Sequence, residues 1–183
     1  MLLILLVPLI LFYFVYVSII RKKNAIEEAF AGIDVQLTKR HELIPNLIET
    51  AKTFMTHERA LFKEITELRA SAMKIGHGKD IEKAFEMESL LEGKLSQLMV
   101  SLEAYPELKS DQSMRDVQKA FEDVEEHLAA SRRFYNSSVR ILNDTVEVWP
   151  MSMVASMIGI KYYPYFEADN KSKAVPDAKK IFS

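Results

Sequence analysis

The first 20 residues of the chain carry no charged side chain, and three basic residues follow at once. Leu, Ile, Val and Phe dominate the run from Met1 to Ile20, and Arg21, Lys22 and Lys23 end it. A helix rises about 1.5 Å per residue, so roughly 20 apolar residues cross the hydrocarbon core of a bilayer. The run therefore predicts a transmembrane helix over residues 1–20.

A cleaved signal peptide is the alternative interpretation of this run. Signal peptides begin with basic residues and end at a small-residue cleavage site. Here nothing basic precedes the run except the α-amino group, and Ser18 is the one small residue near its end. We therefore interpret residues 1–20 as an uncleaved anchor. Because basic residues flank only its C-terminal side, the positive-inside rule predicts an outward amino terminus and a cytoplasmic domain at the cell membrane.

The composition of the remaining chain favours a single helical domain. Roughly 160 residues are enough for one hydrophobic core. The 24 basic and 26 acidic side chains nearly cancel, which gives no basic face for nucleic acid. There is no cysteine, so disulfides, thiolate zinc sites and iron–sulfur clusters are excluded. The five glycines and six prolines are too few for many short strands.

Apolar residues recur every three or four positions along three stretches, as on the buried face of a helix. The stretches run over residues 26–68, 81–102 and 114–149. We predict a glycine-containing loop at residues 75–80 and a turn at residues 107–110. Three long helices with short connections must bury their apolar faces on one another, which gives an antiparallel bundle.

Pro45 interrupts the first stretch. A proline inside a helix removes one backbone hydrogen bond and clashes with the carbonyl four residues earlier. Pro45 therefore either kinks one long helix or begins a new one, and the apolar residues on both sides favour the kink. Asp80 is the predicted N-cap of the second long helix, and Ser110 or Asp111 that of the third. The predicted fold is all-α, with an N-terminal transmembrane helix and an elongated antiparallel bundle of three to four helices over residues 21–150.

The segment 151–167, which follows Pro150, is too apolar for a solvent-exposed tail. It either folds back on the bundle or docks on a neighbouring subunit, a partner or the membrane interface. We expect it to form the main contact between subunits or with a partner, because large apolar patches usually mark interaction sites. The expected contact residues are Met151, Met153, Met157, Ile158, Tyr162, Tyr163, Tyr165 and Phe166. Residues 168–183, rich in Lys, Ser and Pro, are predicted to be a flexible tail.

The polar motifs do not predict chemistry. His41-Glu42 and His57-Glu58 lack the second histidine four residues later that a zinc-binding helix requires. No Glu-x-x-His spacing suits a di-iron bundle, and no serine lies in a nucleophile elbow. We predict no catalytic residue, metal, cofactor or small-molecule substrate, and a metal-binding bundle enzyme is the least favoured alternative.

A polar stretch in the third helix predicts a structural network. Tyr135 is expected to be buried with its hydroxyl bonded, and an arginine to pair with a carboxylate such as Glu58 or Asp34, because buried polar groups are costly unless satisfied. A partner-binding patch is the alternative. The predicted network residues are His57, Glu58, Arg132, Arg133, Tyr135 and Asn136.

Several motifs are spread along the chain: Asp34-Val35-Gln36-Leu37, Arg40-His41, Leu43-Ile44-Pro45-Asn46-Leu47, His57-Glu58, Leu68-Arg69-Ala70, Glu103 to Lys109, Arg132 to Asn136 and Tyr165-Phe166-Glu167. In their order and intervals the chain resembles LemA family proteins over nearly its whole length. The resemblance implies a tethered all-α bundle without catalytic activity. It also implies association with membrane-embedded zinc metalloproteases of the HtpX type or, in one branch, with magnetosome membranes.

These observations predict a single-pass membrane protein whose bundle is an oligomeric scaffold or adaptor. The resemblance adds a metalloprotease partner in membrane-protein quality control. The alternative is a self-assembling protein that organises membranes without a protease.

Overall fold

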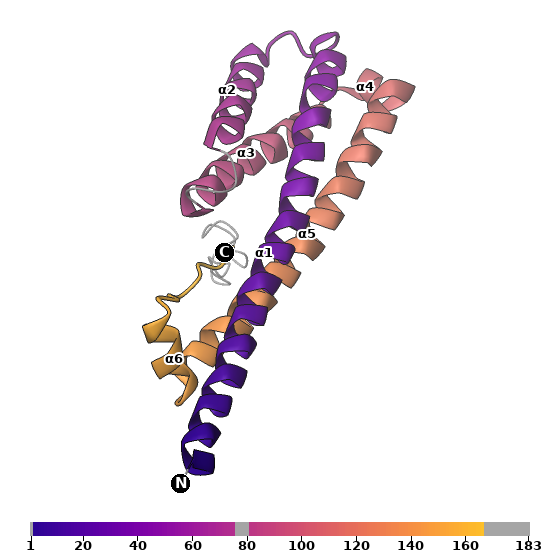
Figure 1. The fold of residues 1–183 in the computed structure, drawn as a ribbon. Coiled ribbons are helices and arrows are strands. Elements are labelled where there is room, and N and C mark those ends of the chain that lie inside the picture. The colour runs from indigo at the N-terminus through magenta and orange to yellow at the C-terminus, as the bar shows by residue number, and fades with distance from the viewer. Residues whose placement is uncertain (1, 76–80, 167–183) are drawn as a thin grey trace, which may run out of the picture. The chain divides into compact units, whose positions relative to one another are not determined.

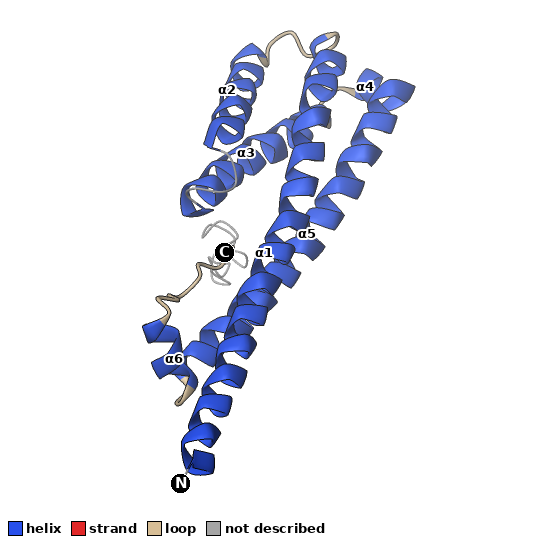
Figure 2. Cartoon of the chain, in the orientation of Figure 1, coloured by secondary structure: helices blue, strands red, loops and turns tan. Residues whose placement is uncertain are grey.

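Every regular element that the structure describes is a helix, as predicted. The computed structural model describes residues 2–75 and 81–166, apart from the side chains of residues 2–5 and 109. Figure 2 shows helices joined by loops over these ranges, without a strand. The helices are α1 (Leu2–Lys52), α2 (Arg59–Ile75), α3 (Ile81–Leu102), α4 (Pro106–Ser110), α5 (Gln112–Glu147) and α6 (Met151–Met157).

The chain divides into two compact units. The first unit combines Met1–Ile44 with Asp116–Tyr165, and the second combines Pro45–Arg115 with Phe166–Ser183. Helices α1 and α5 each contribute to both units.

In the first unit, α1 and α5 lie side by side and antiparallel (Figure 1). The rings of Phe30 and Tyr135 have centroids 6.0 Å apart, and Arg40 Nη1 lies 3.2 Å from Glu125 Oε1. The two contacts are ten residues apart on each helix, and they run in opposite chain directions, from Phe30 to Arg40 on α1 and from Tyr135 to Glu125 on α5. They therefore define one antiparallel register.

The predicted apolar faces of α1 and α5 form the core of the first unit. Their side chains recur at helical spacing and are almost completely inaccessible to solvent. They include Ile19, Ile26, Ile33 and Leu37 of α1, and Leu128, Tyr135, Val139 and Leu142 of α5. The core therefore already begins within the segment 1–20, because Val15 and Ile19 are buried as well.

Helix α1 is continuous through Pro45, so the alternative that Pro45 begins a new helix is wrong. The helix ends only at Lys52, where the amides of Phe54 and Met55 both donate to Ala51 O at 3.1 and 2.9 Å. The prediction that one helix continues to Leu68 is also wrong, because α2 begins at Arg59. Met55 and Phe62 are buried on either side of this turn, so helical spacing persists across the break and conceals it in the sequence.

In the second unit, α2 and α3 pack against each other. Apolar residues of both helices are buried, and Lys94 Nζ forms an ion pair with Glu64 Oε2 at 2.5 Å. The observed bounds of α3 are those of the predicted stretch 81–102. Of the predicted loop at residues 75–80, Ile75 is instead the last residue of α2, and the rest, including the predicted N-cap Asp80, lies outside the described residues.

The connection before α5 is a short helix rather than the predicted turn. Helix α4 begins at Pro106. Proline suits the first helical position because its ring fixes a helical φ angle, and because the N–H that it lacks would have no acceptor within the helix there. Asp111 Oδ1 then accepts a hydrogen bond from Met114 N at 2.9 Å. This bond confirms Asp111, one of the two predicted residues, as the cap of α5.

The segment after α5 turns back along the first unit. Gly159 ends α6 with φ of 72°, a left-handed conformation that glycine adopts without a Cβ penalty. The amide of Ile160 donates to Ala155 O at 3.0 Å, which caps the helix end. Residues 160–166 then follow without regular secondary structure; the predicted flexible tail at residues 168–183 lies outside the described residues.

The predicted transmembrane helix is not found as such in the structure. Across residues 2–75 and 81–166, no helix is both long enough and apolar enough to cross a membrane.

Candidate interaction surface of the first unit

The described part of the uncharged run is largely exposed apolar surface. Among residues 6–20, only Val15 and Ile19 are buried. Its exposed large apolar side chains are Leu6, Val7, Leu9, Ile10, Leu11, Phe12, Tyr13, Phe14 and Tyr16. Contiguous apolar surface of this kind is typical of sites that contact lipid or another protein.

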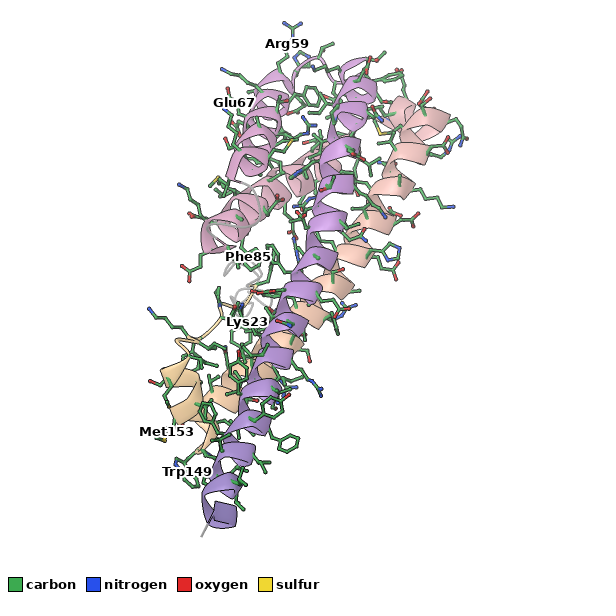
Figure 3. The ribbon with its side chains drawn as sticks, in the orientation of Figure 1. Lys23, Arg59, Glu67, Phe85, Trp149 and Met153 are labelled. Carbon is green, nitrogen blue, oxygen red and sulfur yellow. The ribbon has the colours of Figure 1, made fainter. Side chains whose placement is uncertain are left out.

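A second group of exposed apolar side chains lies where α5 passes into α6. Trp149 is 78% exposed, and Met153 and Met157 of α6 are 62% and 67% exposed. The opposite face of α6 is covered, since Val154 and Ala155 are buried. Figure 3 shows Trp149 and Met153 on the same part of the first unit, where α6 joins α5.

The basic residues that end the uncharged run have different surroundings. Lys23 Nζ lies 3.0 Å from Glu27 Oε1. The hydrogen bond to Glu27, and then its charge, raise the pKa of Lys23. Lys22 Nζ donates to the neutral Ser18 Oγ at 3.0 Å, and Arg21 is exposed.

The residues after α6 form a strap that is bonded to α5. Asn143 Nδ2 donates to Tyr163 O, and Tyr163 N donates back to Asn143 Oδ1, both at 3.1 Å. The amide side chain thus satisfies both backbone groups of Tyr163, as a neighbouring strand would. Tyr135 Oη donates to Pro164 O at 3.0 Å. We call residues 160–165 the strap.

Two tyrosines in these contacts hold their protons more tightly than usual. Burial raises the pKa of Tyr135 to about 12, and the nearby Tyr163 adds to the rise. Tyr162 Oη donates to Glu147 Oε1 at 2.6 Å, and this hydrogen bond raises the pKa of Tyr162. Both bonds need a protonated hydroxyl, so the strap is held by neutral tyrosines.

The eight predicted contact residues do not share one environment. Met153, Met157, Tyr162 and Tyr165 are exposed, and these remain predicted contacts. Met151, Ile158 and Tyr163 are half-buried. Phe166 is buried in the second unit, where its ring centroid lies 3.9 Å from that of Phe85, so this conformation does not offer it to a partner.

The predicted network residues are also divided between the units. Tyr135 is fully buried and bonded, while Arg132 and Asn136 are half-buried and Arg133 is exposed. In the second unit, His57 is exposed and Glu58 is half-buried. A fully buried guanidinium within ion-pair distance of a carboxylate is that of Arg40, which pairs with Glu125.

Sequence reasoning missed Arg40 and Asn143 as structural residues. Arg40 falls between Leu37 and Ile44 at helical spacing, and Asn143 follows Val139 by four positions. A polar residue in phase with an apolar face was the available signal. Among the described residues, no three His, Asp or Glu side chains are placed to hold a metal ion.

Comparison with known proteins gives relatives of two kinds. The chain is 23% identical to the magnetosome protein MamQ of Magnetospirillum gryphiswaldense, over 74% of this chain and 58% of the relative. It is 22% identical to the magnetosome protein MamQ 1 of Paramagnetospirillum magneticum, over 75% of this chain and 59% of the relative. It is also 22% identical to the protein LemA of Metamycoplasma hominis, over 93% of this chain and 79% of the relative.

The chain thus spans less than two thirds of the length of the MamQ proteins that it matches. The profile of the LemA family matches residues 29–179, which include α1 from Ala29 onward and the helices α2 to α6. The resemblance seen in the motifs is confirmed: this chain belongs to the LemA family.

Proposed function

We propose that this protein is a membrane-anchored, non-catalytic helical scaffold. The observation that carries the proposal is the exposed apolar surface at the start of α1, followed directly by Arg21, Lys22 and Lys23. Apolar side chains bounded by a basic cluster suit a bilayer and its anionic surface. The segment 1–20 is the anchor, its amino terminus faces outward, and the rest of the chain lies in the cytoplasm.

The polar groups in the core of the first unit support a scaffold. Arg40 forms an ion pair with Glu125, and Tyr135 and Asn143 donate hydrogen bonds to the strap. Each of these groups fixes one segment of the chain against another. Such pairs define helix register and chain path, which a rigid scaffold needs.

The relatives favour membrane organisation over a protease partner. Two of the relatives above are magnetosome proteins by name, whereas a metalloprotease partner is implied only by the family resemblance. We propose that the exposed residues Trp149, Met153, Met157, Tyr162 and Tyr165 contact a second copy or a partner. Exposed aromatic and methionine side chains are common in such contacts.

Membrane extraction and a reporter fusion test the anchor. The full chain should stay with membranes after alkaline carbonate washing, and a reporter fused after Ser183 should be active in the cytoplasm and silent outside. Recovery of a protein that begins near Arg21 would show a cleaved signal peptide instead. The opposite reporter pattern would overturn the orientation.

Paired substitutions test the contact surface. Changing Met153 and Met157 to Ser should abolish crosslinks between copies, or to a co-purified metalloprotease, without lowering the melting temperature. The matched control changes Leu90 and Val100, two exposed apolar residues of α3, to Ser. If both pairs leave crosslinking unchanged, the contact lies elsewhere; a captured metalloprotease would favour the quality-control role over self-assembly.

A further inference from the structure

A pocket of about 600 Å³ lies along α1 at the end of the uncharged run. Its lining residues within the described ranges all belong to α1, where they fall in neighbouring pairs that recur every four positions and so lie on one face of the helix. The lining residues are Tyr13, Phe14, Val17, Ser18, Arg21, Lys22 and Ala25. We call this pocket the α1 groove.

The α1 groove changes from apolar to basic along the helix. Tyr13, Phe14 and Val17 form its first part, and Arg21 and Lys22 lie beyond them. From Tyr13 to Arg21 the helix advances roughly 12 Å. A ligand that fits both parts must therefore combine a hydrocarbon chain with an anionic group at one end.

The cations of the groove are not neutralised by carboxylates. Neither Arg21 nor Lys22 is in an ion pair with any residue of the described ranges. Lys23, labelled in Figure 3, differs because its ammonium already pairs with Glu27 at 3.0 Å and does not line the groove. Two positive charges beside a hydroxyl, that of Ser18, are suited to a phosphate group.

We propose that the α1 groove binds one anionic phospholipid. Its acyl chain lies along Tyr13, Phe14 and Val17, and its phosphate is held by Arg21, Lys22 and the hydroxyl of Ser18. This inference rests on the proposed membrane function, since it names the lipid that the anchored scaffold selects. A basic residue near an anionic bilayer surface gains affinity even without a groove, so the test must separate the groove from general attraction.

The test compares Arg21→Gln with Lys23→Gln, which each remove one positive charge. The full chain, purified in mild detergent, is titrated with phosphatidylglycerol or phosphatidylcholine, and bound lipid is counted by native mass spectrometry. Arg21→Gln should weaken phosphatidylglycerol binding about five-fold, and the double variant with Lys22→Gln roughly 30-fold. Lys23→Gln should change it less than about two-fold, because that charge is already paired.

Further arms identify the ligand class. Phe14→Ser should also weaken phosphatidylglycerol binding, and phosphatidylcholine should bind several-fold more weakly than phosphatidylglycerol to the wild type. Equal losses in Arg21→Gln and Lys23→Gln would overturn the groove in favour of diffuse attraction. Displacement of the lipid by inorganic phosphate alone would show a simple anion site. Lipid binding is measured in detergent and does not depend on membrane anchoring. If the protein is lost from carbonate-washed membranes but still binds phosphatidylglycerol selectively, the proposed anchor is wrong and the proposed lipid site is retained.

Discussion

Single polar side chains placed in phase with the apolar faces decide much of the first unit. Arg40, Tyr135 and Asn143 are all buried; Arg40 pairs with Glu125 of α5, whereas Tyr135 and Asn143 both bond the strap. Burial of Tyr135 was predicted from its spacing with Leu128 and Val139. Its acceptor, Pro164 O, was not, because helical spacing says nothing about which loop returns to cover a helix. The partner of Arg40 could not be read either, since several carboxylates lie at suitable spacing along the chain.

Ionisation of Tyr135 should make stability fall at alkaline pH. An unfolded tyrosine loses its proton near pH 10.0, whereas folded Tyr135 holds it to about 12. The stabilisation that depends on protonated Tyr135 is therefore complete below pH 10 and is lost as the pH rises to about 12. The free energy of unfolding should fall by about 3 kcal/mol over this range. Urea unfolding across this pH range, compared with Tyr135→Phe, measures it. Equal alkaline slopes in both proteins would contradict the prediction, while Tyr135→Ala should cost roughly 2–4 kcal/mol already at neutral pH.

Removing the carboxylate opposite Arg40 should destabilise the first unit. Arg40 is fully buried and its Nη1 lies 3.2 Å from Glu125 Oε1. Glu125→Gln should therefore lower the free energy of unfolding by about 1–3 kcal/mol. The control is Glu67→Gln in the exposed pair with Lys63, 3.7 Å apart, which should cost less than about 0.5 kcal/mol. Equal effects in the two variants would show that burial of Arg40 does not depend on its ion pair.

At the scale of elements, the sequence predicted helices better than it predicted their ends. The bounds of α3 and the cap of α5 could be predicted because Pro106 and Asp111 act locally. The end of α1 at Lys52 could not, because no glycine or proline marks the turn before Arg59. The return of the strap depends on bonds between distant residues, so composition left four locations open for the segment 151–167.

Loss of the Asn143 amide should release the strap while leaving α5 intact. Asn143 makes two hydrogen bonds to the backbone of Tyr163. Asn143→Ala should speed hydrogen exchange at the amide of Tyr163 and lower stability by about 1–3 kcal/mol. Thr145→Ala is the matched control, because Thr145 bonds only to Ile141 O of its own helix. Unchanged exchange in Asn143→Ala would mean that other contacts hold the strap.

At the scale of the whole molecule, the segment predicted to be the anchor is part of a longer helix that continues into the predicted bundle. Residues 2–20 are the beginning of α1, and Val15 and Ile19 belong to the core of the first unit. The uncharged run could be recognised from composition. Its division into an exposed part and a buried part could not, because both parts are equally apolar and only the antiparallel partner distinguishes them.

Two truncations of different length should therefore behave differently. Deleting residues 1–12 removes exposed apolar side chains and should leave the melting temperature of the remaining chain nearly unchanged. Deleting residues 1–20 also removes buried Val15 and Ile19, and should cost about 3–6 kcal/mol. Calorimetry of both fragments, with circular dichroism for helicity, checks this. Equal melting temperatures would show that the core begins only after Arg21.

The continuity of α1 from Leu2 to Lys52 has an angular consequence. Each residue of a helix turns the chain by about 100°. In a continuous helix, the direction in which Tyr13 and Phe14 face is therefore fixed relative to that of Ile33 and Leu37. One residue inserted after Ser18 would swing the aromatic half of the α1 groove away from Arg21 by more than a quarter turn, with every side chain retained. The direction in which the α1 groove faces is thus fixed by the packing of α1 in the core of the first unit.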